Sequence, residues 1–330
     1  MNPAFLHHGG DLAAAIRTYG GVRAEWLDLS TGINPLPWPV PKDLPINWSE
    51  LPDRKALAAL EREAAAHFGA DPALCRTVPG SEAALRLIAP VLGLPGRHFP
   101  LTYRSHVEAF DQACPHQAGA VDPATVLVVA NPNNPDGTLR HPDQIVALLA
   151  AQEANSGWLL VDEAFADCHP SASVANMVRP ERRLIVLRSF GKFFGLAGVR
   201  LGFVLAPPNV LAALHRRLGA WPVNAAALAI GQAAYADQAW VTVTIDNLRA
   251  RAAALDDVLF RHRLTVQGAC PLFRLVHVPA AEAMFEGLAH RLILTRPFEQ
   301  SGKLLRVGLP RDLAALARLD AALAAIVRHG

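Results

Sequence analysis

Three short apolar segments each lead into residues that could do chemistry. The segments and the letters that follow them are Thr125–Ala130 before NPNNPDG, Trp158–Val161 before DEAF, and Leu184–Leu187 before RSFGK. Asn134, Asp162 and Ser189 are separated by 28 and 27 residues, about one strand-plus-helix unit each. Ligands of open α/β sheets bind at the carboxyl ends of the strands. We therefore expect an amide, a carboxylate, a hydroxyl and the amine of Lys192 to converge at one sheet edge.

The amine and the carboxylate suggest a particular cofactor. The chain has 31 Lys and Arg residues, of which only Lys42, Lys55, Lys192 and Lys303 are lysines. A primary amine can condense with an aldehyde, whereas a guanidinium, which is always protonated, cannot. A buried carboxylate such as Asp162 can keep a pyridine nitrogen protonated, which makes the ring an electron sink. This combination predicts pyridoxal 5'-phosphate bound to Lys192.

Other residues could complete a site for this cofactor. Asn134 could donate to the ring oxygen, and Ser189 and Arg200 could bind the phosphate through charge-assisted bonds. Ser81 and Glu82 precede an apolar helix over Ala83–Val91, and a helix N-terminus binds phosphate readily. Tyr103 could stack on the ring.

Each of these features has a simpler interpretation when taken alone. NPNNPDG could be only a turn, Asp162 could cap a helix or bind magnesium, and Tyr103 could be a packing residue. The magnesium interpretation is weakened because no GxxxxGK[ST] loop accompanies the carboxylate. Their joint occurrence, in order, favours the cofactor site.

The elements that must position these residues follow from the apolar pattern. Apolar runs alternate with helical periods, including a helix over His141–Glu153, which predicts a doubly wound, mostly parallel α/β domain over residues 46–220. Residues 1–45, rich in glycine and proline, are expected to form an arm near the active site. Helices and short strands over residues 221–330 predict a smaller α+β domain that ends in a helix over Leu313–Val327.

Composition narrows the class of protein. Of the 330 residues, 52% are hydrophobic and 18% are charged, with a net charge of +2, so we expect a folded chain that does not bind nucleic acid. The four cysteines form no CxxC pair, which argues against a zinc site or a disulfide framework. No signal segment and no run of ~18 apolar residues is present, so we expect a cytoplasmic protein with no membrane partner.

The motifs resemble those of a known family. NPNNPDG, VDEAF and SFGKFFGLAGVRLGF are similar, in order and spacing, to segments of the class I and II aminotransferases of pyridoxal-phosphate fold type I. The resemblance implies a homodimer in which Lys192 forms the Schiff base and Asp162 pairs with the pyridinium nitrogen. It also implies the cofactor-binding set of Asn134, Ser189, Arg200, Tyr103, Ser81 and Glu82.

Within the family, the N-terminal segment separates two groups. His8-Gly9-Gly10-Asp11 and the later WLDLSTGINPLP resemble the opening of L-threonine-O-3-phosphate decarboxylases of cobalamin biosynthesis, and histidinol-phosphate aminotransferases do not usually begin in this way. The resemblance implies decarboxylation of O-phospho-L-threonine to (R)-1-aminopropan-2-ol O-phosphate. An amino-acid aminotransferase, or a cofactor-binding protein without catalysis, remains an alternative.

The same resemblance implies a site for a small phosphorylated amino acid. Its residues would be His8, Gly9, Gly32, Asn134, Arg296 and Arg306. Arg306 matches the arginine that binds the α-carboxylate in aminotransferases. The simpler interpretations are surface ion pairs for Arg296 and Arg306 and a solvated chain end for His8.

Three further positions stand where relatives carry residues that contact the cofactor or its aspartate. Phe165 and Leu51 stand where many relatives carry tyrosines that contact the cofactor. His106, three residues after Tyr103, is placed where some aminotransferases bond a histidine to the pyridinium aspartate, or it could be an exposed residue at a helix start.

Overall fold

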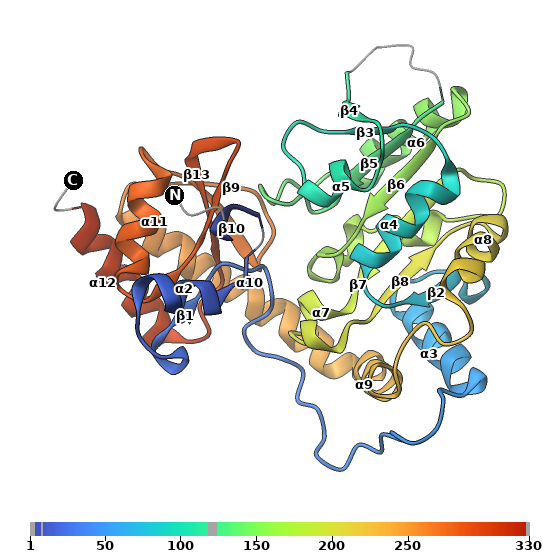
Figure 1. Cartoon of the computed structure of the whole chain (residues 1–330), viewed down its shortest axis with the longest axis horizontal. Coiled ribbons are helices and arrows are strands. Elements are labelled where there is room, and N and C mark those ends of the chain that lie inside the picture. Colours follow the sequence, from blue (N-terminus) through green and yellow to red (C-terminus); the bar gives the residue numbers. More distant parts are fainter. Residues whose placement is uncertain (1–3, 8, 118–123, 328–330) are drawn as a thin grey trace. The chain divides into compact units, whose positions relative to one another are not determined.

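The chain divides into two compact units. The computed structural model describes residues 4–7, 9–117 and 124–327. The large unit consists of residues 37–134 and 139–242, and the small unit consists of residues up to 36, 135–138 and those from 243 onward (Figure 1). The domain limits expected from the sequence, after residues 45 and 220, stay a prediction. The large unit extends to residue 242 because α9 (Ala225–Ala236) packs against α3 (Arg54–His67).

A seven-stranded sheet forms the centre of the large unit, with strand order β2-β8-β7-β6-β5-β3-β4. All neighbouring pairs from β7 to β4 are parallel, and β8 is antiparallel to both of its neighbours. The predicted parallel strands and the α/β class are thus confirmed. The strands are β2 (Cys75–Val78), β3 (Gly96–His98), β4 (Ala113–Pro115), β5 (Val126–Ala130), β6 (Trp158–Asp162), β7 (Leu184–Ser189) and β8 (Gly202–Leu205).

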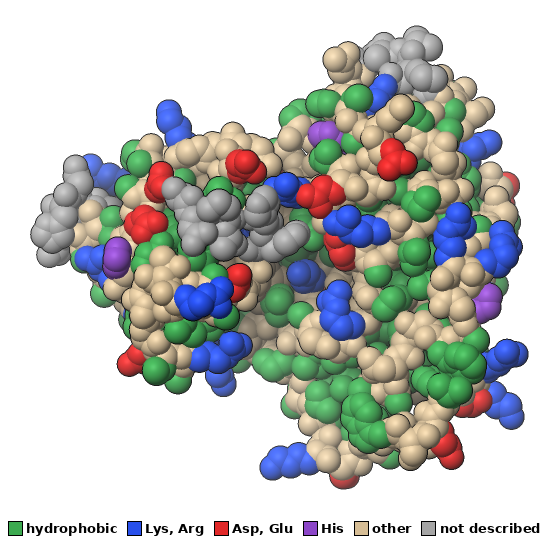
Figure 2. Space-filling view, in the orientation of Figure 1, with side chains coloured by type: hydrophobic (Ala, Val, Ile, Leu, Met, Phe, Trp, Pro, Cys, Tyr) green, Lys and Arg blue, Asp and Glu red, His purple; other side chains and the backbone are tan. Residues whose placement is uncertain are grey.

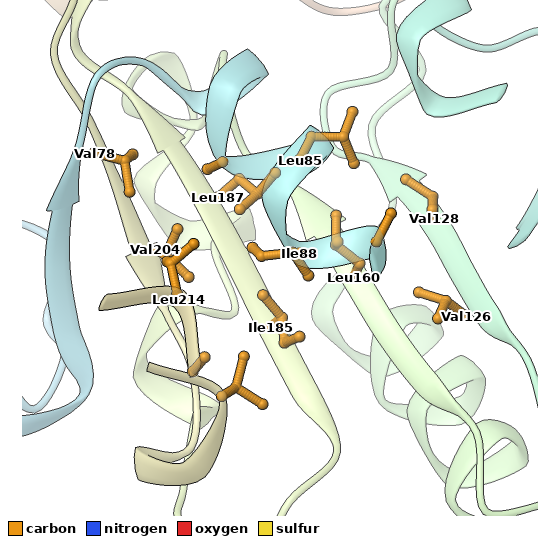
Figure 3. Packing of buried hydrophobic residues seen from close by; sticks show 14 of the residues in the cluster. Val78, Leu85, Ile88, Val126, Val128, Leu160, Ile185, Leu187, Val204 and Leu214 are labelled. Atoms are coloured by element: carbon orange, nitrogen blue, oxygen red, sulfur yellow. The ribbon is translucent and has the colours of Figure 1, made fainter. Parts of the chain in front are cut away.

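Helices cover the sheet and bury its apolar side chains. Leu85 and Ile88 of α4 (Ser81–Leu92) pack on residues of the central strands, such as Leu160 and Ile185, and Leu214 of α8 joins the same cluster (Figure 3). Fully buried aliphatic strands are typical of a parallel sheet that is covered on both faces. The other helices of this unit are α5 (Arg104–Glu108), α6 (Pro142–Ala154), α7 (Phe190–Phe193) and α8 (Pro208–Leu218).

The small unit has α+β character. Its antiparallel sheet has the order β12-β13-β10-β9, and β1 (Leu27–Asp28) pairs in parallel with β11 (Ile293–Leu294). The remaining strands are β9 (Thr265–Gln267), β10 (Phe273–His277), β12 (Arg296–Phe298) and β13 (Ser301–Gly308). The helices are α1 (Ala4–His7), α2 (Leu12–Tyr19), α11 (Ala281–Ala289) and α12 (Leu313–Val327), and α10 (Gln238–Arg261) begins in the large unit.

No helix in the described part of the chain combines the length and the apolar character that crossing a bilayer requires.

Candidate active site

Asp162 ends β6 and is held by a buried histidine. Its Oδ2 lies 3.0 Å from Nε2 of His106, and its Oδ1 accepts a bond from the Ala164 N–H at 3.1 Å. Nδ1 of His106 lies 2.8 Å from Oγ1 of Thr102, and the imidazole is fully buried. Because a carboxylate can only accept, Nε2 donates to Asp162, and Nδ1 of a neutral ring accepts from Thr102. The expected contact between His106 and Asp162 is confirmed, and the exposed position is excluded.

Tyr103 lies beside this pair. Its ring meets that of His106 edge-on, with 5.6 Å between centroids and an interplanar angle of 89°. Burial raises the pKa of Tyr103, and the negative charges of Glu82 and Asp162 raise it further. Tyr103 therefore lies within electrostatic range of Glu82 and of Asp162, two other residues expected in the site.

An anion-binding corner lies at the start of α4. Gly80 caps this helix with φ of +95°, and a Cβ there would stand 2.9 Å from Nη2 of Arg200. A Cβ on Gly202 would stand 2.7 Å from the Ser81 nitrogen, and Gly202 is the cross-strand partner of Ser189. The two glycines thus bring the helix N-terminus, the end of β7 and a guanidinium together. N–H groups and a cation in this arrangement suit a phosphate.

Lys192 follows β7, the neighbour of β6. Its Nζ lies 5.9 Å from the ring centroid of Phe165, three residues after Asp162, and the lysine is half-buried. The Glu163 N–H donates to the Leu187 carbonyl at 2.9 Å, which joins the ends of the two strands. The amine is therefore on the same sheet edge as the carboxylate, as the strand pattern predicts.

Hydrogen bonds connect the NPNNPDG turn to the end of β6 and to the segment just before Thr102. The Asn131 N–H donates to the Asp162 carbonyl at 2.9 Å, and the Asn131 carboxamide accepts from the Arg140 N–H at 2.8 Å. The Asn133 side chain donates to the Leu101 carbonyl at 2.9 Å, just before Thr102. These bonds fix the loop that contains the next residue, Asn134, which is half-buried.

A buried charge cluster on β6 and β7 was not found by sequence reasoning. Arg188 Nη1 donates to Glu163 at 2.9 Å, its Nη2 bonds to Asp167, and His67 lies 2.9 Å from Asp167. Burial raises the pKa of Glu163 although Arg188 opposes the change. Burial alone would raise the pKa of Asp167, but Arg188 and His67 hold it below its usual value. The available signal was an arginine in the otherwise apolar strand LIVLRS, since a buried charge needs partners.

This cluster, which we call the Arg188 cluster (Arg188, Glu163, Asp167 and His67), lies next to the site in the sequence. Glu163 follows Asp162, and Arg188 precedes Ser189. Glu163 also accepts from the Val174 N–H and the Ser173 hydroxyl, each at 2.6 Å. The cluster therefore fixes the chain directly after Asp162, the candidate partner of the pyridinium nitrogen. It also fixes the chain directly before Ser189, a candidate phosphate-binding residue.

The small unit carries the two candidate substrate arginines. Arg296 and Arg306 are cross-strand partners on β12 and β13 and are only 6% and 4% exposed, so they are not surface residues. Arg306 Nη2 donates to the Ser30 carbonyl at 2.6 Å, and its guanidinium carbon lies 5.2 Å from the Phe273 ring centroid. Two neighbouring buried guanidinium groups favour an anionic ligand.

The glycines expected at the substrate lie in the same unit. Gly9 packs against Ser30, because a Cβ on Gly9 would stand 2.2 Å from the Ser30 carbonyl oxygen. Gly32 is buried. His8 lies outside the described residues, so its predicted role is untested.

Comparisons with known proteins bear on the family of this chain. The family model described as "Aminotransferase class I and II" matches residues 93–313. A threonine-phosphate decarboxylase of Pseudomonas aeruginosa is 42% identical over 96% of this chain and 97% of its own length. The chain belongs to the class I and II aminotransferase family.

Two further family members extend the comparison. A threonine-phosphate decarboxylase of a Sinorhizobium species is 40% identical over 96% of this chain and 97% of its own length. The crystal structure of histidinol-phosphate aminotransferase from Sinorhizobium meliloti, in complex with pyridoxal-5'-phosphate, superposes with a TM-score of 0.82. That structure is 20% identical and covers 96% of this chain and 94% of its own, so it supports the shared fold.

Two positions bear on how this family member differs. Phe165 is 5% exposed and presents a ring, without a hydroxyl, toward the Lys192 amine. Leu51 is 66% exposed in the segment between β1 and α3. Neither residue has the phenolic hydroxyl through which tyrosines of many relatives contact the cofactor. Other residues of the site must therefore provide the hydrogen bonds to the cofactor.

Proposed function

We propose that this protein is a pyridoxal-phosphate-dependent carboxy-lyase that converts O-phospho-L-threonine into (R)-1-aminopropan-2-ol O-phosphate and CO₂, a step of cobalamin biosynthesis. The observation that carries the proposal is the likeness to two threonine-phosphate decarboxylases, 42% and 40% identical and matched over nearly their whole length. The site geometry supports the same assignment.

The residues of the large unit fit the cofactor. In the corner formed by Gly80, Ser81 and Arg200, the helix N-terminus and the guanidinium come close together because Gly80 and Gly202 lack a Cβ, and such an arrangement suits a phosphate. Asp162, oriented by His106, provides a carboxylate that can bond a protonated pyridine nitrogen. Pyridoxal phosphate supplies an aldehyde for an amine and a ring that accepts the electrons of the breaking bond.

The protein's own contribution is to bind, orient and move protons. Lys192 would provide the amine that holds the cofactor and would be the nearest base once the substrate amine has replaced it. Asn134 would donate to the ring oxygen, Ser189 and Arg200 would hold the phosphate, and Tyr103 would cover the ring face. The positions of these residues described above and the family membership support these roles.

The small unit would select the substrate. A phosphorylated amino acid carries two anions, and Arg296 and Arg306 provide two buried cations on neighbouring strands. Arg306 is the candidate for the α-carboxylate, with Gly9 and Gly32 close to the substrate. Loss of CO₂ requires the bond from Cα to the carboxylate to stand perpendicular to the cofactor ring, and a fixed guanidinium can impose that orientation.

One assay tests the proposal. The purified, cofactor-loaded protein is incubated with O-phospho-L-threonine without any keto acid, and CO₂ and the product amine are measured. We expect stoichiometric release of both. Activity that appears only when 2-oxoglutarate is added would show an aminotransferase, and a protein that binds the cofactor but converts neither substrate mixture would be non-catalytic.

We also propose that the protein forms a homodimer through the large unit. Trp48, Leu51 and Trp221 are 75%, 66% and 55% exposed, and Trp48 and Trp221 line one groove with Arg200. Figure 2 shows hydrophobic side chains gathered on the large unit, and exposed apolar patches of this kind mark interaction sites. A second copy of the chain would cover this patch beside the phosphate-binding corner.

A further inference from the structure

Ser30 joins three segments of the small unit. It is 2% exposed, and its Oγ accepts a bond from the Gly10 N–H at 2.7 Å. Its carbonyl oxygen accepts from Nη2 of Arg306 at 2.6 Å. One residue is thus bonded both to the N-terminal glycine turn and to the candidate carboxylate-binding arginine.

Asp28 fixes the direction of these bonds. Its Oδ1 accepts from the Ser30 N–H at 2.9 Å and from the Ser30 hydroxyl at 2.6 Å. Since the hydroxyl has one proton and gives it to Asp28, its oxygen is the acceptor for Gly10. Asp28 therefore sets both the backbone and the side chain of Ser30.

Close backbone approach on both sides leaves this segment little room to move. A Cβ on Gly9 would stand 2.2 Å from the Ser30 carbonyl oxygen, and a Cβ on Gly308 would stand 2.5 Å from that of Thr31. The Gly308 N–H also donates to the Leu29 carbonyl at 2.7 Å. The strand that carries Arg306 and the turn that contains Gly9 therefore both lie against residues 29–31.

We propose that Ser30, held by Asp28, is a positioning residue that couples the Gly9–Gly10 turn, which the proposed function places beside the substrate, to the Arg306 guanidinium, so that these two contacts with the substrate are set together. The proposal rests on the substrate proposed above. Ser30 needs no contact with the substrate, because its carbonyl orients the arginine and its hydroxyl anchors the turn. The specificity for a phosphorylated amino acid then depends on a residue outside the binding surface.

The test measures ligand affinity in the cofactor-loaded protein. Dissociation constants for O-phospho-L-threonine are obtained from the change in the visible absorbance of the bound cofactor, with L-threonine and inorganic phosphate as probes of one anion each. Ser30→Ala should weaken binding of O-phospho-L-threonine about five- to thirty-fold, the effect of losing one or two hydrogen bonds. It should weaken L-threonine and phosphate as well, whereas Arg306→Lys should weaken chiefly L-threonine.

Conservative variants separate positioning from general stability. Asp28→Asn keeps an acceptor oxygen for Ser30 and should retain affinity within about threefold, while Asp28→Ala should behave like Ser30→Ala. Thr18→Ala is the matched control, because among the described residues its hydroxyl bonds the Ala14 carbonyl of its own helix. The spectrum without ligand should stay the same in all variants, since Lys192 and Asp162 belong to the large unit.

The possible outcomes are distinct. Unchanged affinity for all three ligands in Ser30→Ala, or a loss confined to one anion, overturns the coupling. If Ser30→Ala does not fold, equal affinities of Asp28→Asn and Asp28→Ala overturn it. A wild-type protein that binds O-phospho-L-threonine without releasing CO₂ refutes the proposed reaction but leaves the affinity test valid, and one that does not bind it refutes both.

Discussion

At the scale of single residues, the proposed site depends on the Lys192 amine, which an arginine side chain cannot replace. Lys192→Arg keeps the positive charge beside Phe165, but a guanidinium cannot condense with an aldehyde. We expect the visible band of the bound cofactor to shift to that of the free aldehyde and turnover to fall at least about 10²-fold, as loss of an essential base does. Absorbance spectra and CO₂ release measure both effects. Lys42→Arg, at an exposed position, is the control, and a fully active Lys192→Arg protein would refute the assignment.

The buried triplet of Thr102, His106 and Asp162 leads to a second prediction. Thr102→Val removes the hydroxyl that Nδ1 of His106 bonds while keeping the side-chain volume, so a buried polar atom loses its partner. Nδ1 of His106 then lacks its donor, so the imidazole is less firmly held and Asp162 is less firmly oriented. We expect kcat to fall about five- to fifty-fold, since such a partner contributes about 1–3 kcal/mol. Thr102→Ser should restore it, and equal rates for the two variants would contradict the role of the hydroxyl.

The residues of the site differ in how much their own sequence reveals. Lys192, Asp162 and Asn134 follow long apolar strands, so their common sheet edge was predictable. Ser30, Thr102 and Arg188 were not predicted as members of bonded groups, because their partners are 20 to 276 residues away or depend on the path of a loop. A hydroxyl beside an apolar run has no periodic signal, and only the folded chain shows which donor meets it.

At the scale of elements, Gly80 at the start of α4 makes the proposed phosphate-binding corner beside Arg200 possible. Gly80→Ala places a Cβ 2.9 Å from Nη2 of Arg200 and displaces the guanidinium. Loss of one charge-assisted bond should raise the Kd of the cofactor about ten- to hundred-fold. Cofactor titration of the apoprotein measures this value.

A second glycine provides the control for backbone strain. Gly219 has φ of +78°, and in the described part of the chain no atom lies within 4 Å of its Cβ position, so an added methyl group would meet no neighbour there. Both Gly80→Ala and Gly219→Ala should lose about 1–3 kcal/mol of stability, because both backbones favour glycine. Only the former should lose cofactor affinity. An equal effect on affinity would show that strain, not the corner, is responsible.

The Arg188 cluster links β6 to β7 and predicts a pH effect. Arg188→Met leaves Glu163 and Asp167 buried without their cation, which should cost about 3–5 kcal/mol at neutral pH. Without Arg188, burial raises the folded-state pKa of Glu163 still further above its unfolded value, so the folded state binds more protons there, whereas Asp167 keeps its bond to His67. Stability of the variant should therefore increase as the pH falls from ~7 to ~5 and decrease as it rises.

Denaturant unfolding at several pH values checks this prediction. In the wild type, the lowered pKa of Asp167 gives stability that is lost as the pH falls, whereas the raised pKa of Glu163 gives stability that is lost as the pH rises, so the two contributions oppose each other. Arg182→Met, which breaks a half-buried surface pair with Glu153, is the control and should cost about 1 kcal/mol or less. A variant whose stability loss does not change with pH would contradict the charge cluster.

The elements themselves show which parts of the fold a sequence pattern can predict. The strands β5, β6 and β7 have five or six residues, nearly all aliphatic, and were expected where they occur. The strands β3, β4 and β9 have three residues each, GRH, ACP and TVQ, which carry neither alternation nor an apolar run. Their place in the sheets is set by the neighbours with which they pair, so local pattern could not reveal them.

At the scale of the whole molecule, the chain passes between its units four times. It changes unit after Leu36, Asn134, Thr138 and Thr242. The NPNNPDG turn contains one of these changes, because Asn134 belongs to the large unit and the residues after it to the small unit. Residues that are distant in sequence belong to the same unit, and composition alone gives only approximate limits. The expected arm over residues 1–45 accordingly contributes residues to both units.

The exposed apolar patch of the large unit gives the last prediction. If Trp48, Leu51 and Trp221 are covered by a second copy, the wild type should have about twice the 35.4 kDa mass of the chain. Leu51→Asp would bury an unpaired charge in that interface and should yield a monomer at low micromolar concentration. Light scattering over a range of concentrations measures both masses. Phe260→Asp, at an 81% exposed position of the small unit, should remain dimeric. If Leu51→Asp also remains a dimer, the interface lies elsewhere; if the dissociated variant binds the cofactor more weakly, a second copy helps to close the corner around Arg200.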